Sequence, residues 1–88
     1  MKLYTVRKEA MYLHDLVGVF DTKQMAEKVA MECAESDVDD WHNYVVGSVV
    51  VGGYAIDPEH NMQWSKHIQD CITPIVSYSK EKAPLILN

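Results

Sequence analysis

The stretch Tyr44-Val45-Val46-Gly47-Ser48-Val49-Val50-Val51 constrains the fold more than any other part of the chain. Its β-branched residues predict a strand over 44–51. Side chains alternate between the two faces of a strand, and a strand with one solvated face alternates apolar and polar residues. Residues 44–51 are apolar on both faces. We therefore expect this strand to be covered on both sides, by helices of the same chain or by another subunit.

A helix is predicted over 22–36, before this strand. Asp21 can accept a hydrogen bond from the first N–H groups, and Gln24 follows three residues later, as in a capping box. Phe20 and Met25 occupy the positions of a hydrophobic staple. Spacings of three and four residues predict one buried stripe, formed by Met25, Ala26, Val29, Ala30, Cys33 and Ala34.

A second helix is predicted over 58–72. Asp57 is a suitable cap, Pro58 fits the first helical position, and Glu59 lies near the positive end of the helix dipole. Pro74 disfavours helical geometry at the residue before it, so this helix should end near Cys71 and Ile72.

Three further strands complete the pattern. Residues 2–7 and 13–20 read as strands joined by a longer loop over 8–11, and residues 75–78 are a strand candidate in the tail. The expected order is strand, strand, helix, strand, helix, possible strand. A helix between the second and third strands suggests a crossover between parallel strands. We therefore expect an α+β fold in one domain over 1–88, with a small mixed sheet of three to four strands and two helices.

The first two-thirds of the chain resembles a group of small uncharacterised phage and bacterial proteins. The likeness rests on Met1-Lys2-Leu3-Tyr4-Thr5-Val6 and on Val17-Gly18-Val19-Phe20-Asp21-Thr22, which leads into a helix bearing Ala26. It covers about residues 1–56. The resemblance implies a compact ββαβ core of unknown activity and transfers no functional residues.

Charge and cysteine content narrow the functional classes. The net charge of −5 argues against direct nucleic-acid binding, because a protein that holds a phosphate backbone is usually basic. Two cysteines are too few for the disulfide framework of a small secreted domain. No signal-peptide core and no stretch of about 20 apolar residues is apparent. We therefore expect a cytoplasmic protein that is not inserted in a membrane.

An acidic cluster is the most prominent candidate site. Five carboxylates fall within nine residues and are followed by a tryptophan: Glu32, Glu35, Asp37, Asp39, Asp40 and Trp41. Carboxylates near a helix C-terminus oppose the helix dipole, so helix stability does not favour them there. They form either a solvated helix end or a docking patch for a protein with a basic surface. The second interpretation predicts a non-catalytic protein-interaction module, such as a phage-type accessory or inhibitor protein that binds a host macromolecule.

Two alternatives remain at the level of sequence. His60, His67 and Cys71 project from one face of the second predicted helix, so a small metal- or ligand-binding protein is the second hypothesis. His60 and His67 are two turns apart, however, which is too far to share one ion easily. No recognisable catalytic motif is present, so an enzyme is the third hypothesis and no cofactor is expected.

A homodimer is expected from the doubly apolar strand. If both helices pack on one face, the other face is left against water, together with the apolar tail. Contiguous apolar surface of this kind marks an interface, and a two-fold dimer is its commonest form. The expected interface residues are Tyr44, Val46, Val50, Leu85 and Leu87.

Overall fold

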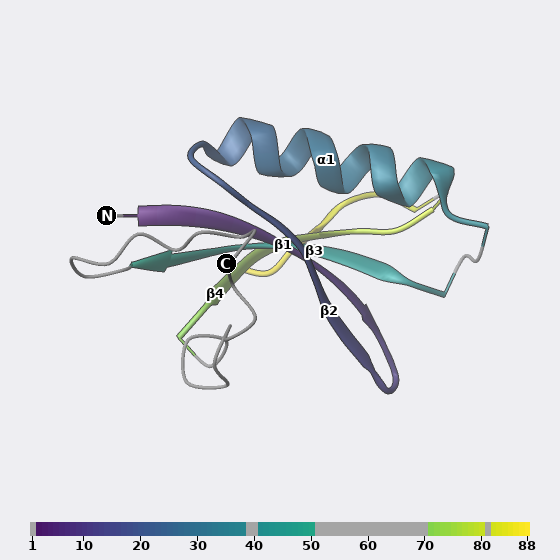
Figure 1. The fold of residues 1–88 in the computed structure, drawn as a ribbon. Coiled ribbons are helices and arrows are strands. Elements are labelled where there is room, and N and C mark those ends of the chain that lie inside the picture. The colour runs from purple at the N-terminus through teal and green to yellow at the C-terminus, as the bar shows by residue number, and fades with distance from the viewer. Residues whose placement is uncertain (1, 39–40, 51–70, 81) are drawn as a thin grey trace.

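The computed structural model shows one five-stranded sheet with a helix across one face (Figure 1). It describes residues 2–38, 41–50, 71–80 and 82–88. The strands are β1 (Lys2–Ala10), β2 (Leu13–Phe20), β3 (Asn43–Val50), β4 (Thr73–Tyr78) and β5 (Leu85–Ile86). The helix is α1 (Lys23–Ser36).

The expected fold class is wrong. The sheet has five strands in the order β2-β1-β3-β4-β5, and every neighbouring pair is antiparallel, so it is not a mixed sheet of three to four strands. β2 and β3 do run in the same direction with α1 between them, but β1 lies between the two strands and pairs with both. The crossover therefore produces no parallel pair. The fold is mostly β.

The described part of the chain contains one helix, not two. Most of the second predicted helix, over 58–70, lies outside the described residues. Cys71 and Ile72, where that helix was expected to end, are not helical.

The β1–β2 hairpin is tighter than expected. β1 continues to Ala10, and a two-residue connection, Met11–Tyr12, replaces the predicted loop over 8–11. Val6 pairs with Gly18 and Arg7 pairs with Leu16, which leaves Val17 as the extra residue of a β-bulge. The strands predicted over 13–20, 44–51 and 75–78 are present as β2, β3 and β4, with β3 and β4 beginning one and two residues earlier than predicted. Residue 51 lies outside the described residues.

Helix α1 begins one residue later than the sequence suggested. The N-cap is Thr22, whose hydroxyl accepts a hydrogen bond from the Met25 N–H at 3.2 Å. Asp21 therefore precedes the cap, and Gln24 does not occupy the capping-box position. The shift does not change which face of the helix is buried.

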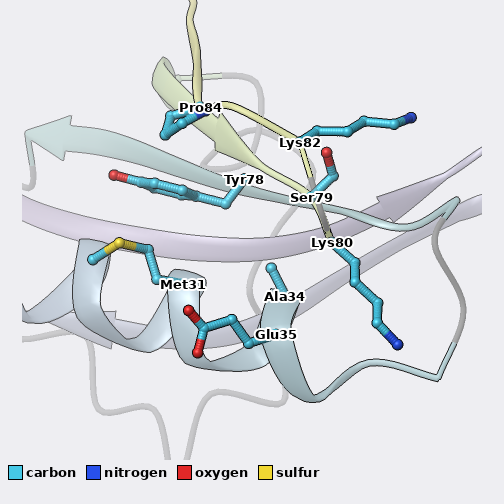
Figure 2. A pocket seen from close by; sticks show the side chains of 8 residues that line it. All are labelled: Met31, Ala34, Glu35, Tyr78, Ser79, Lys80, Lys82 and Pro84. Atoms are coloured by element: carbon cyan, nitrogen blue, oxygen red, sulfur yellow. The ribbon is translucent and has the colours of Figure 1, made fainter.

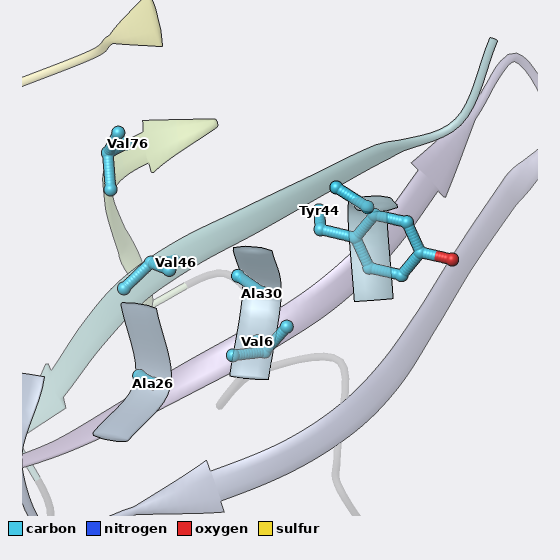
Figure 3. Close-up of a cluster of buried hydrophobic side chains, with 7 residues drawn as sticks. Val6, Ala26, Ala30, Tyr44, Val46 and Val76 are labelled. Atoms are coloured by element: carbon cyan, nitrogen blue, oxygen red, sulfur yellow. The ribbon is translucent and has the colours of Figure 1, made fainter. Parts of the chain in front are cut away.

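The core lies between α1 and one face of the sheet (Figure 3). Ala26, Ala30 and Ala34 recur every four residues and are the buried residues of the helix. Their small side chains let α1 lie close to the sheet. The cluster that they form with the strands contains Val6, Ala26, Ala30, Ala34, Tyr44, Val46 and Val76. Met25, expected in the buried stripe, is half exposed.

Candidate functional site

A buried polar network joins the end of α1 to the start of β3. Asp37 directly follows α1, and its Oδ2 accepts a hydrogen bond from the Tyr44 hydroxyl at 2.5 Å. The same oxygen lies 3.0 Å from His42 Nδ1. The side chains of Asp37 and His42 are 6% and 8% exposed, and Tyr44 is equally buried. Three polar groups thus satisfy one another where water is largely excluded.

The pKa of Tyr44 is raised well above its usual value near 10. Burial is the main cause, followed by the hydrogen bond to Asp37 and the negative charge of that carboxylate. All three favour the neutral phenol, which keeps its proton and continues to donate to Asp37. The network is therefore a fixed connection between the helix end and the sheet.

A lysine from a distant part of the chain completes this region. Lys80 Nζ donates a hydrogen bond of 3.0 Å to the Asp37 carbonyl oxygen. The last turn of α1 contains no basic residue, so Lys80 brings a cation to the negative end of the helix dipole. Ser36 Oγ also donates to the Glu32 carbonyl at 2.9 Å. The helix end is thus tied to the segment that follows β4.

The structure separates the members of the acidic cluster. Asp37 is buried in the network, whereas Glu32 and Glu35 are exposed on the last turns of α1. Asp39 and Asp40 lie outside the described residues. Trp41 is 60% exposed, and its ring packs at 4.2 Å, centroid to centroid, on the His42 ring. The cluster is therefore not one uniform acidic patch.

Two further apolar residues in or just after the last turns of α1 are exposed, and the sequence analysis did not single them out. Val38 is 89% exposed and Met31 is 42% exposed. We use the name α1-end surface for five of the exposed residues in the last turns of α1 and the segment that follows it, namely Met31, Glu32, Glu35, Val38 and Trp41. The sequence did offer a signal for Val38, because this apolar residue stands between Asp37 and Asp39 in an acidic segment whose solubility does not require it.

A cleft of about 630 Å³ borders the α1-end surface (Figure 2). Met31, Ala34 and Glu35 of α1 form one wall, and Tyr78 and Pro84 lie opposite. Ser79, Lys80 and Lys82 complete the lining. Burial is the main cause that raises the pKa of Tyr78, with a contribution from the negative charge of Glu27. The cleft thus offers apolar walls beside Glu35.

The residues expected at a dimer interface are divided between the core and the surface. Tyr44 and Val46 lie beneath α1, because the helix covers the face of β3 that we expected to be left open. Val50 is 75% exposed, and Leu85 and Leu87 are also exposed. Three of the five residues are therefore accessible.

The described residues contribute one member of the alternative metal site. Cys71 is exposed with a free thiol, while His60 and His67 lie outside the described part. In that described part, no three His, Cys, Asp or Glu side chains are grouped closely enough to hold a metal ion.

No helix among the described residues has the length and apolar character needed to span a bilayer. Comparison with protein-family models, curated proteins and solved structures finds no match.

Proposed function

We propose that this chain is a small non-catalytic protein-interaction module that binds a partner with a basic surface through the α1-end surface. The observation that carries the proposal is the exposure of Val38 and Trp41 within a few residues of two exposed carboxylates of α1. Interfaces favour aromatic and methionine anchors surrounded by polar residues, and this surface supplies both. The expected compartment is the cytoplasm, where the thiols of Cys33 and Cys71 stay reduced.

The buried network supports this proposal because it pre-organises the surface. Asp37 precedes Val38, and His42 follows Trp41, so both exposed anchors are adjacent to residues held in the network. Anchors on a rigid support lose less conformational entropy when a partner binds. The network therefore contributes to affinity without touching the partner.

The charges of Glu32 and Glu35 also support binding. Each lies near the C-terminus of α1, where a carboxylate costs about 0.3–1 kcal/mol when exposed. Stability alone would favour neutral residues at both positions. Retaining two unfavourable charges is consistent with a partner of opposite sign.

The first test is a matched comparison of charge variants. A tagged chain is cross-linked in lysate, and the captured partner is identified by mass spectrometry, purified and titrated by calorimetry at two salt concentrations. The double variant Glu32→Gln/Glu35→Gln should bind more weakly and with less dependence on salt. Asp15→Asn/Asp21→Asn removes the same charge from exposed positions elsewhere and should bind like the wild type. Equal loss in both variants would show that net charge, and not this surface, is responsible.

The second test addresses the aromatic anchor. Trp41→Ala removes a side chain of the type that dominates interface energies, so the dissociation constant should rise about thirtyfold, which corresponds to 2 kcal/mol. Tyr12→Ala removes another highly exposed aromatic, at the tip of the β1–β2 hairpin, and should leave the affinity unchanged. Unchanged affinity of Trp41→Ala would contradict the proposal that the partner binds through the α1-end surface.

A further inference from the structure

The sheet ends in two edges of different character. β2 forms one edge and β5 forms the other. An edge strand carries backbone N–H and C=O groups that can pair with another chain, and proteins commonly prevent this with charged side chains or bulges. The β2 edge has both, because Asp15 is exposed and Val17 is the extra residue of a bulge. The β2 edge is therefore protected against further pairing.

The β5 edge lacks these two protections. β5 pairs with β4 without a register shift, and residues 83–88 contain no charged side chain. The apolar side chains here are accessible, since Leu85 is 61% exposed, Ile86 is 71% exposed and Leu87 is 44% exposed. Within the described ranges, β4 is the one strand that pairs with β5. An uncharged apolar edge of this kind is suited to accept another strand.

The hydrogen bonds of β5 show which residue faces the open edge. The Leu87 N–H donates to the Ile75 carbonyl oxygen at 2.9 Å, so this N–H points to β4. In an antiparallel strand, the backbone groups of successive residues point to opposite neighbours. The N–H and C=O of Ile86 therefore point away from β4, to the open edge. Pro84 has no N–H to donate, which confines pairing at this edge to a few residues.

We propose that β5 pairs with β5 of a second copy of this chain, so that the two sheets join into one. A two-fold axis beside Ile86 sets this residue opposite its copy, and the two residues exchange both of their outward N–H···O=C bonds. The same register sets Leu85 of each copy opposite Leu87 of the other. Every side-chain pair is thus apolar, and no charge is buried.

A second copy fits this edge because the segment Leu85-Ile86-Leu87 is complementary to itself in an antiparallel pair. The homodimer expected from the sequence is thereby placed on another surface, since Tyr44 and Val46 lie beneath α1. No residue of the α1-end surface belongs to β5, so the inference does not rest on the proposed function. The pairing is short, and the dimer is therefore weak, with a dissociation constant of about 100 μM.

Sedimentation equilibrium measures self-association between about 10 μM and about 1 mM protein, a range that brackets this value. The wild-type mass should rise from 10.0 kDa toward twice that value. Ile86→Asp should weaken association about tenfold or more, because it sets two carboxylates opposite each other. Val50→Asp is the matched control, since Val50 is 75% exposed but lies on β3, and it should associate like the wild type. A mass of 10.0 kDa at every concentration, or equal loss in both variants, would overturn the proposal.

Disulfide cross-linking tests the register. Ile86→Cys in a Cys71→Ser background should form a linked dimer on oxidation, because hydrogen-bonded partners in an antiparallel pair have Cα atoms about 5.5 Å apart, within reach of a disulfide. Leu85→Cys and Leu87→Cys should link faster when mixed than alone, since each is opposite the other. Val50→Cys in the same background measures random collisions. If Ile86→Cys links no faster than Val50→Cys, pairing through β5 is contradicted.

Discussion

The two faces of the sheet differ in how completely their polar groups are paired. The face beneath α1 carries Val6 and Val46 against three helix alanines, and its polar groups form the closed network of Asp37, His42 and Tyr44. The second face carries the ion pair of Arg7 and Glu9 and a buried Thr5 hydroxyl that has no hydrogen-bond partner among the described residues. The polar groups are thus mutually satisfied beneath the helix and less completely satisfied on the other face.

The largest effect should come from a charge placed beneath α1. Val46 is fully buried, so Val46→Asp puts a carboxylate into the core without a partner and should cost several kcal/mol, enough to prevent folding. Val50→Asp makes the same change four residues later on β3, where the side chain is exposed, and should change stability by less than about 0.5 kcal/mol. Circular dichroism and urea unfolding measure both. Equal stability of the two variants would contradict the placement of the core.

The next effect concerns Gly47 of β3, whose Cα has close neighbours on the face away from α1. Gly47→Ala places a Cβ 2.5 Å from Ile72 Cγ2 and 3.1 Å from the Thr73 carbonyl oxygen, so both segments must move. We expect a loss of 1–3 kcal/mol in the free energy of unfolding. Gly18→Ala is the control, because its closest contact is the far end of the Phe20 ring, which can rotate away. If Gly47→Ala is the less damaging of the two, the second face is looser than the structure indicates.

Some parts of this fold could be predicted from the sequence alone, and others could not. The β-branched run of β3 predicted a strand covered on both faces, and the spacing of Ala26, Ala30 and Ala34 predicted the helix face that covers one of them. Both are local patterns. The position of β1 between β2 and β3 depends on pairing between distant segments, which no local pattern determines. The prediction of a mixed sheet was wrong for this reason.

The candidate sites were less predictable than the fold. Asp37 looked like one more exposed carboxylate, and only the geometry of the connection to β3 turns it inward onto Tyr44. Thr5 read as an ordinary strand residue, and its unpaired hydroxyl follows from the register that sets it opposite Gly47. Exposed residues such as Glu32, Glu35 and Trp41 could be singled out, because charge and aromatic character are visible in the sequence.

The closed network of the first face can be tested with pH. Tyr44→Phe removes the hydroxyl that donates to Asp37 and should cost about 1.5 kcal/mol at neutral pH, because that hydrogen bond is made to a carboxylate. The pKa of Tyr44 is raised in the folded state, so above pH 10 the unfolded chain loses this proton while the folded chain retains it. Wild-type stability should therefore fall as pH rises above 10.

The same titration in the variant identifies the group. Tyr44→Phe should lose less stability between pH 9 and pH 11 than the wild type does, with the remaining loss due in part to Tyr78, whose pKa is also raised. Urea unfolding at each pH gives the slopes, and absorbance near 295 nm follows tyrosine ionisation. Parallel slopes in the two proteins would mean that Tyr44 does not hold its proton in the fold.

The smallest effect is a gain in stability on the second face. Thr5→Val keeps the shape of the side chain and removes the one buried side-chain polar atom that lacks a partner in the described residues, so the free energy of unfolding should rise by about 1 kcal/mol. Thr5→Ser is the matched control, since it keeps the hydroxyl and loses the methyl group, and it should be less stable than the wild type by about 1 kcal/mol. Urea unfolding measures both variants. If Thr5→Val were destabilising, the hydroxyl would already have a partner in the folded chain, and the second face would be as closed as the first.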